Sequence, residues 1–82
     1  MKRIALISII VEEMNSVESL NALLHEYADC ILGRMGLPCR ERGISLISVA
    51  VDAEQDKISA LSGKIGKLEG ISAKTVYSKT EN

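Results

Sequence analysis

Two Gly-Lys pairs stand three residues apart in the segment SGKIGKLEG, residues 62–70. Gly-Lys is the dipeptide near the end of the phosphate-binding loop of P-loop proteins, whose full pattern is G-x-x-x-x-G-K-[ST]. In the register of Gly66 and Lys67, Leu61 replaces the first glycine and Leu68 replaces the final Ser or Thr. The other register fails at the same two places. The spacing therefore argues against a P-loop in this segment.

The segment also contains G-x-x-G at residues 63–66, the pattern of the RNA-binding loop of KH domains. A KH loop joins two helices, and only three residues separate this pattern from Gly70. The chain carries 10 Lys and Arg against 11 Asp and Glu, whereas nucleic-acid-binding domains are usually basic. We therefore expect no direct binding to DNA or RNA.

The segment is better explained as the end of a helix. Apolar residues at helical spacing form a core stripe at Ile58, Leu61, Ile65 and Leu68. Next to this stripe lies a face of small residues, Ser59, Ser62, Gly63 and Gly66. Each glycine inside a helix costs about 1 kcal/mol relative to alanine, so we predict that a backbone of this chain or of another subunit packs closely against this face. Gly70 is predicted to end the helix in the left-handed conformation.

His25, Cys30 and Cys39 are the only residues of the types that most often bind zinc. Their spacing, H-x4-C-x8-C, fits no common zinc pattern and provides too few ligands for a closed structural site. Two cysteines in an intracellular chain are most often free thiols. We therefore expect no metal or other cofactor. The alternative is a metal held between subunits, where symmetry would supply further ligands.

Glu12 and Glu13 are adjacent carboxylates, and paired carboxylates can act as acid and base. Adjacent strand residues face opposite sides, so these two cannot flank one substrate. The sequence also shows no pairing of a nucleophile with a base, and we predict that the protein is not an enzyme. The start of the following helix could attract a small anion or carboxylate. We therefore predict a small-ligand site at Glu13, Asn15 and Ser16.

A single domain, residues 1–82, must position these groups, because the chain has no visible linker or repeat. Strands are predicted at residues 2–11, within 31–42, and at 44–51 and 71–78 from the pattern of apolar residues. Helices are predicted to begin at Asn15 and Asp52, where Glu18 and Gln55 would complete capping boxes. The core stripe of the first helix is predicted to contain Val17, Leu20, Leu24, Tyr27, Ala28 and Ile31.

This order of elements predicts the ferredoxin-like β-α-β-β-α-β unit, an α+β fold with a four-stranded antiparallel sheet and two helices on one face. The strands at 2–11 and 44–51 are apolar on both faces and fit the central positions, whereas Pro38 and Lys74 fit edge strands. The face without helices keeps an apolar row from each central strand, which is typical of an interface. We therefore expect a homodimer or homotetramer assembled through the sheet.

No apolar run in the chain approaches the length of a membrane span. Residues 1–11 have the charge-then-apolar order of a signal peptide, but Glu12 and Glu13 stand where its small-residue cleavage site would be. We interpret this segment as a strand and expect a cytoplasmic protein with no membrane partner.

Two segments, LLHEYADCILGRMGLPCRERGISLISVAVDA and ISALSGKIGKLEGISAKTVYSK, resemble the small regulators of iron-only hydrogenase systems. The most specific part is the pattern A-L-S-G-K-[IL]-G-x-[IL]-x-G-[IV]-x-[AV]-K-T, residues 60–75 here. That family is similar to ACT-like regulatory domains and to the C-terminal domain of the nickel-responsive regulator. The resemblance implies a ferredoxin-like fold, assembly through sheets, and a small-molecule effector or a hydrogenase-system protein as partner.

Together, the residues and the resemblance predict a non-enzymatic, oligomeric regulatory domain that senses a small ligand at a subunit interface. One alternative is a metal-dependent sensor that uses His25 and the cysteines across an interface. The other is a protein–protein adaptor that binds no ligand.

Overall fold

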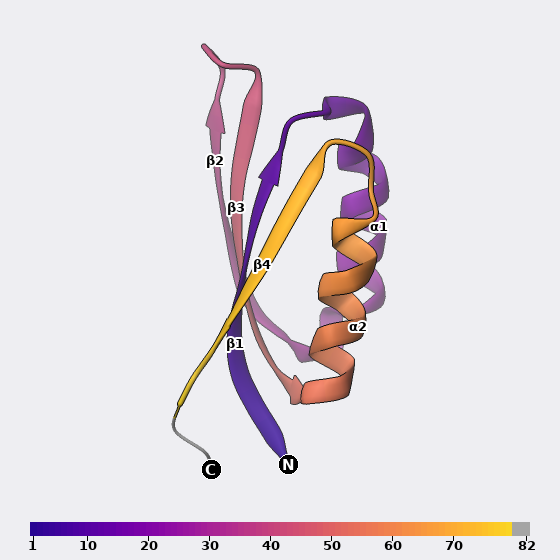
Figure 1. The fold of residues 1–82 in the computed structure, drawn as a ribbon, viewed down its shortest axis with the longest axis vertical. Helices are drawn as coiled ribbons and strands as arrows, with labels where there is room; N and C mark the ends of the chain where they lie inside the picture. The colour runs from indigo at the N-terminus through magenta and orange to yellow at the C-terminus, as the bar shows by residue number, and fades with distance from the viewer. Residues whose placement is uncertain (80–82) are drawn as a thin grey trace.

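The computed structural model describes residues 1–79 and consists of one sheet with the helices packed on one side of it (Figure 1). The strands are β1 (Lys2–Val11), β2 (Ile31–Cys39), β3 (Ile44–Glu54) and β4 (Ile71–Tyr77). The helices are α1 (Val17–Glu26) and α2 (Gln55–Gly66), with short 3-10 turns η1 (Met14–Ser16) and η2 (Ala28–Cys30). The strand order is β2-β3-β1-β4 and every neighbouring pair is antiparallel. The predicted α+β ferredoxin-like fold is confirmed.

The two apolar strands, β1 and β3, occupy the centre of the sheet, as predicted. They pair along their whole lengths, from Lys2 opposite Glu54 to Val11 opposite Ser45. β2 and β4 form the edges, where the missing N–H of Pro38 is tolerated. The position of each strand, at the centre or at an edge of the sheet, therefore agrees with its residue types.

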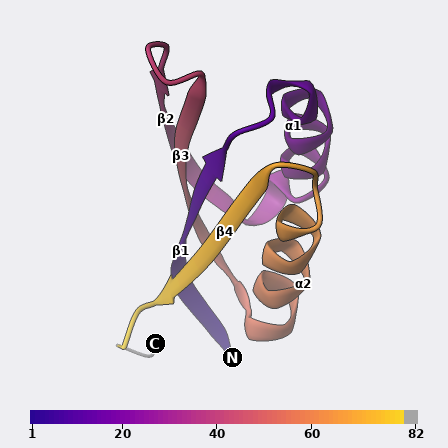
Figure 2. The same ribbon diagram turned by 45° about the horizontal axis from the view of Figure 1, so that its top comes forward.

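The core lies between the sheet and the two helices, which cover the same face (Figure 2). Ala5, Ile7, Ile9 and Val11 of β1 alternate along the strand and are at most 2% exposed. They meet the buried apolar stripes of the helices and of β3. The buried helix and β3 residues are Leu20, Leu24, Ile58, Leu61, Ile65, Val49, Val51 and Ala53.

The first helix starts later than predicted. Asn15 lies in η1, and its backbone N–H donates to the Glu13 carboxylate at 3.2 Å. α1 begins only at Val17 and has no side-chain cap. The Ser16 hydroxyl instead donates to the backbone carbonyl of Glu69 at 2.7 Å. The predicted capping box at Asn15 is therefore wrong, because a contact with a distant loop sets how the chain enters the helix.

The second helix also begins later than predicted. β3 continues beyond residue 51 to Glu54, because Asp52 still pairs with Ile4 of β1. Gln55 is consequently the first residue of α2, and Glu54 precedes the helix without a capping side-chain bond. The predicted capping box of Asp52 and Gln55 is wrong, because strand pairing with β1 holds Asp52 in an extended conformation.

Both helices end earlier than their apolar patterns predict. α1 ends at Glu26, and Ala28 is exposed rather than in the core because the chain has already turned into η2. α2 ends at Gly66, whereas Gly70 lies in the turn that enters β4. Gly70 has a φ of 68°, which confirms its predicted left-handed conformation. No helix in the described part of the chain combines the length and hydropathy needed to cross a membrane.

Candidate interaction surface on the open face of the sheet

The face of the sheet opposite the helices is here called the open face. It carries seven large apolar residues whose exposed fractions lie between 37% and 76%. They are Ile4, Leu6, Ile10, Met35, Leu37, Leu46 and Val76. The apolar β1 residues on the other face are at most 2% exposed by comparison. The apolar rows predicted on the uncovered face are therefore confirmed, and the edge strands extend them.

Cross-strand pairing arranges the open face in rows that run across the strands. The first row contains Leu37, Leu46, Ile10 and Ser72. The second contains Met35, Ser48, Ser8 and Lys74, and the third Gly33, Ala50, Leu6 and Val76. A fourth contains Asp52 and Ile4. Apolar rows thus lie on both sides of one row that contains two hydroxyls and an ammonium group.

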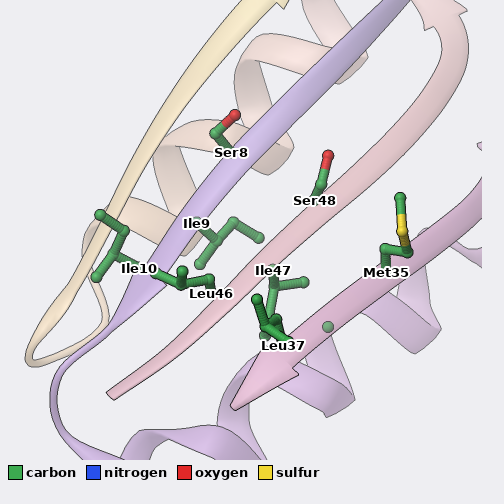
Figure 3. Close-up of a pocket in the computed structure, with 9 residues that line it drawn as sticks. Ser8, Ile9, Ile10, Met35, Leu37, Leu46, Ile47 and Ser48 are labelled. Carbon is green, nitrogen blue, oxygen red and sulfur yellow. The ribbon is translucent and has the colours of Figure 1, made fainter. Parts of the chain in front are cut away.

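A hollow of about 460 Å³ lies over the first two rows. Figure 3 shows its lining residues, which come from the neighbouring strands β1, β3 and β2. Among the described residues that line it, the polar side chains are Ser8 and Ser48, which lie directly opposite each other on β1 and β3. Small-molecule sites typically measure about 300–1,000 Å³ and combine apolar walls with a few polar groups. The hollow has the volume and lining of such a site, but it is open to solvent, so a second surface would have to cover it to bury a small, mostly apolar molecule.

The predicted ligand residues Glu13, Asn15 and Ser16 lie together between β1 and α1, but the side chains of Glu13 and Ser16 already form hydrogen bonds within the protein. The Glu13 carboxylate accepts from the Asn15 backbone, and the Ser16 hydroxyl donates to the carbonyl of Glu69 at 2.7 Å. Ser16 is only 9% exposed. A ligand site here stays a prediction in which the Asn15 side chain and the outer part of Glu13 would make the contacts.

The structure does not bring His25, Cys30 and Cys39 together. The buried Cys30 thiol donates to the backbone carbonyl of Tyr27 at 3.3 Å, and His25 is exposed on α1. Cys39 lies at the far end of β2, roughly 30 Å from Cys30 along that strand. Within residues 1–79, no three His, Cys, Asp or Glu side chains are grouped to hold a metal ion. A metal shared between subunits stays a prediction.

The small-residue face of α2 divides into two parts. The hydroxyl of Ser62 accepts a hydrogen bond from the Thr75 hydroxyl at 3.0 Å, and the Ser59 hydroxyl lies 3.4 Å from the Tyr77 hydroxyl. These serines therefore lie against β4. A methyl group added at Gly63 or Gly66 would meet no atom of residues 1–79 within 4 Å. The predicted close packing of these glycines is therefore wrong within the chain, because the helix turns them outward; packing against another subunit stays a prediction.

Replacing Gly63 by alanine distinguishes a helix face that nothing covers from one that packs against another subunit. If nothing covers the helix, we expect the free energy of unfolding to rise by about 0.5–1 kcal/mol, because alanine restricts the unfolded chain and favours the helix. Denaturant unfolding followed by circular dichroism measures the change. A loss of stability that appears only in the assembled protein would instead show that a second subunit packs against Gly63.

Sequence reasoning missed the contribution of β2 to the hollow. Met35 and Leu37 line it, although their strand is interrupted by Gly36 and Pro38 and has a weak pattern. The alternation of Gly33, Met35 and Leu37 on one side was the available signal. Their neighbours on β3 could not be identified, because a register shift lies between Ile31 and Gly33.

Comparisons with known proteins agree with this architecture over nearly the whole chain. The structure of uncharacterized protein TM1266 from Thermotoga maritima is similar, with a TM-score of 0.92 and 36% sequence identity. The similarity covers 96% of this chain and 100% of that chain. No curated protein matches the chain. Residues 3–75 match the TM1266-like family model. The chain therefore belongs to the TM1266-like family, described as "Iron-only hydrogenase system regulator, putative".

Proposed function

We propose that this protein is a non-enzymatic, cytoplasmic regulatory domain of an iron-only hydrogenase system, that it works as a homo-oligomer assembled through the open face, and that it senses a small effector at the subunit boundary. The family description supports the regulatory role. The open face, with its seven exposed large apolar residues, is the observation that carries the assembly.

The extent of the open face favours assembly. Its seven large apolar residues are on average about half exposed and occupy neighbouring rows of the sheet on both sides of the row that contains Ser8 and Ser48. Monomeric soluble proteins rarely expose contiguous apolar patches larger than a few hundred Å². Covering this patch would remove apolar surface from water on both partners at once, which is the main favourable term in most protein association.

The position of the polar groups favours binding over catalysis. Ser8 and Ser48 are the hydroxyls in the hollow, and a serine nucleophile needs a neighbouring base. The single histidine, His25, is on α1, on the opposite side of the sheet from both hydroxyls. Two hydroxyls in an apolar hollow suit hydrogen bonding to one end of a small molecule whose remainder is apolar.

Assembly is tested by analytical ultracentrifugation of the full chain at concentrations from about 1 to 100 μM. We expect a dimer or a larger oligomer that dissociates on dilution. A monomer throughout this range would contradict the proposed assembly. Loss of hydrogenase regulation is tested separately, by deleting the gene in its host and measuring hydrogenase activity; unchanged activity under all growth conditions would contradict the regulatory role.

The effector is tested by thermal unfolding with a panel of hydrophobic amino acids, short carboxylic acids and divalent metals. A ligand that binds the native state raises its melting temperature. We expect a mostly apolar compound to do so in the wild type and not in Ser48→Val, whereas the control Ser72→Val on the same face should retain the effect. A metal that stabilises the wild type but not His25→Ala would favour the metal sensor. No response to any compound would favour the adaptor.

A further inference from the structure

Two charged side chains of opposite sign, Lys74 and Asp52, lie among the apolar residues of the open face. Lys74 is on β4 beside Ser8, and Asp52 is on β3 beside Ile4. Within residues 1–79, neither side chain forms a hydrogen bond or an ion pair. The adjoining outermost row also places opposite charges together, Lys2 across from Glu54.

The register gives these two charges a symmetric placement about one residue. Lys74 lies one strand to one side of β1, level with Ser8, and Asp52 lies one strand to the other side, level with Ile4. The midpoint between them is therefore Leu6, which is 48% exposed. Strand spacing and rise put the two charges roughly 17 Å apart.

We propose that two copies of this chain pair through their open faces about a two-fold axis at Leu6, so that Lys74 of each copy contacts Asp52 of the other. A two-fold interface uses the same patch twice, and a residue that contacts a second residue is contacted by it in return. An axis at Leu6 and perpendicular to the line between Lys74 and Asp52 exchanges their positions. Lys74 and Asp52 of each copy are then both paired with an opposite charge.

The charge pattern favours a second copy over a different protein as the occupant. A two-fold interface needs a patch that complements itself, and complementary charges fix the register and disfavour partners with another charge pattern. Here one cation and one anion lie on opposite sides of an apolar centre, so the face complements itself. This inference rests on the proposed homo-oligomer and adds its register. The hollow, which lies over the rows on the Ser8 side of Leu6, would then be beside the axis, where an effector could contact both copies.

The test is a charge exchange measured by analytical ultracentrifugation of the full chain. Lys74→Asp and Asp52→Lys each bring like charges together at both symmetric contacts. We expect each to raise the dimer dissociation constant by about tenfold or more. The double variant Lys74→Asp with Asp52→Lys restores opposite charges, and we expect it to return to within about threefold of the wild type. Leu6→Asp, which places a carboxylate against its own copy, should abolish pairing.

Matched controls change the same charges outside the open face. Lys67→Asp and Glu41→Lys alter net charge equally at exposed positions, after α2 and in the turn between β2 and β3. We expect both to leave the dissociation constant unchanged, and an effect equal to that of the face variants would overturn the inference. Circular dichroism confirms that each variant is folded.

Two results would overturn the inference in different ways. If the wild type assembles but the double variant is no better than the single ones, the proposed register is wrong and the homo-oligomer stands. The charges would then only keep the face soluble or contact something else. If the wild type is monomeric at every concentration, both the register and the proposed assembly are wrong.

Discussion

Replacing Gly70 by alanine is expected to lower the free energy of unfolding by about 2–5 kcal/mol. Gly70 has a φ of 68°, a conformation that costs alanine energy because of its Cβ. That Cβ would also clash with the Cβ of Glu13 and lie 2.9 Å from the Glu13 backbone nitrogen. The contact cannot relax easily, because the backbone N–H of Glu12 donates to the carbonyl of Gly70 at 2.7 Å.

Gly43 provides a matched control for Gly70→Ala. It has nearly the same φ, 67°, but an added methyl group would meet no atom within 4 Å in the part of the chain that the structure describes. Gly43→Ala should therefore cost only the backbone penalty, about 1–2 kcal/mol. Denaturant unfolding of both variants gives the cost of the clash as the difference between them. Equal losses would show that Glu13 shifts away from the added methyl group at little cost, despite the bond between Glu12 and Gly70.

The sequence was sufficient for the sheet because alternation is a local property. Ile4, Ala5, Leu6 and Ile7 already show that both faces of β1 are apolar, which places this strand in the centre. Pro38 shows an edge, because it cannot donate a ladder hydrogen bond. These features depend on each strand alone, and with the ferredoxin-like order of elements they settle the arrangement of all four strands.

The starts of the helices could not be predicted in the same way. Asn15 and Asp52 have the residue types of helix caps, and each has a suitable partner three residues later. Contacts with distant segments decide otherwise. Ser16 is held by Glu69, 53 residues away, and Asp52 is held by pairing with β1. Local preference of about 1 kcal/mol per cap is overridden by such packing.

The candidate surface was predicted only in outline. The even-numbered residues of β1 identified an open apolar face, but its rows depend on register between strands. The position of Leu6 midway between Lys74 and Asp52 follows from two sets of strand pairs that no single segment encodes. The hollow likewise depends on β2 lying beside β3, which brings Met35 next to Ser48. These contacts depend on pairs of strands, and the residue pattern of one strand does not encode them.

Replacing Tyr27 by alanine is the second substitution with a large expected effect, a loss of about 3–5 kcal/mol in the free energy of unfolding. The chain has two aromatic residues, both Tyr, and no Phe or Trp. Tyr27 follows α1 directly and is only 9% exposed. Its backbone carbonyl accepts from both the N–H and the thiol of Cys30, at 3.0 and 3.3 Å. The ring therefore fills the core where α1 gives way to η2, and alanine would leave a cavity.

Two further variants show whether the ring, rather than the hydroxyl, carries this stability. The Tyr27 hydroxyl accepts a hydrogen bond from Lys64 of α2 at 3.0 Å, which raises the pKa of the lysine ammonium. Because Lys64 is exposed and its ammonium can be solvated by water, Tyr27→Phe should retain most of the stability, measured by denaturant unfolding. Tyr77→Ala removes a half-buried ring at the end of β4 and should cost less than Tyr27→Ala. A Phe variant as unstable as Tyr27→Ala would place the energy in the bond to Lys64, and α1 and α2 would then be joined chiefly by a polar contact rather than by the core.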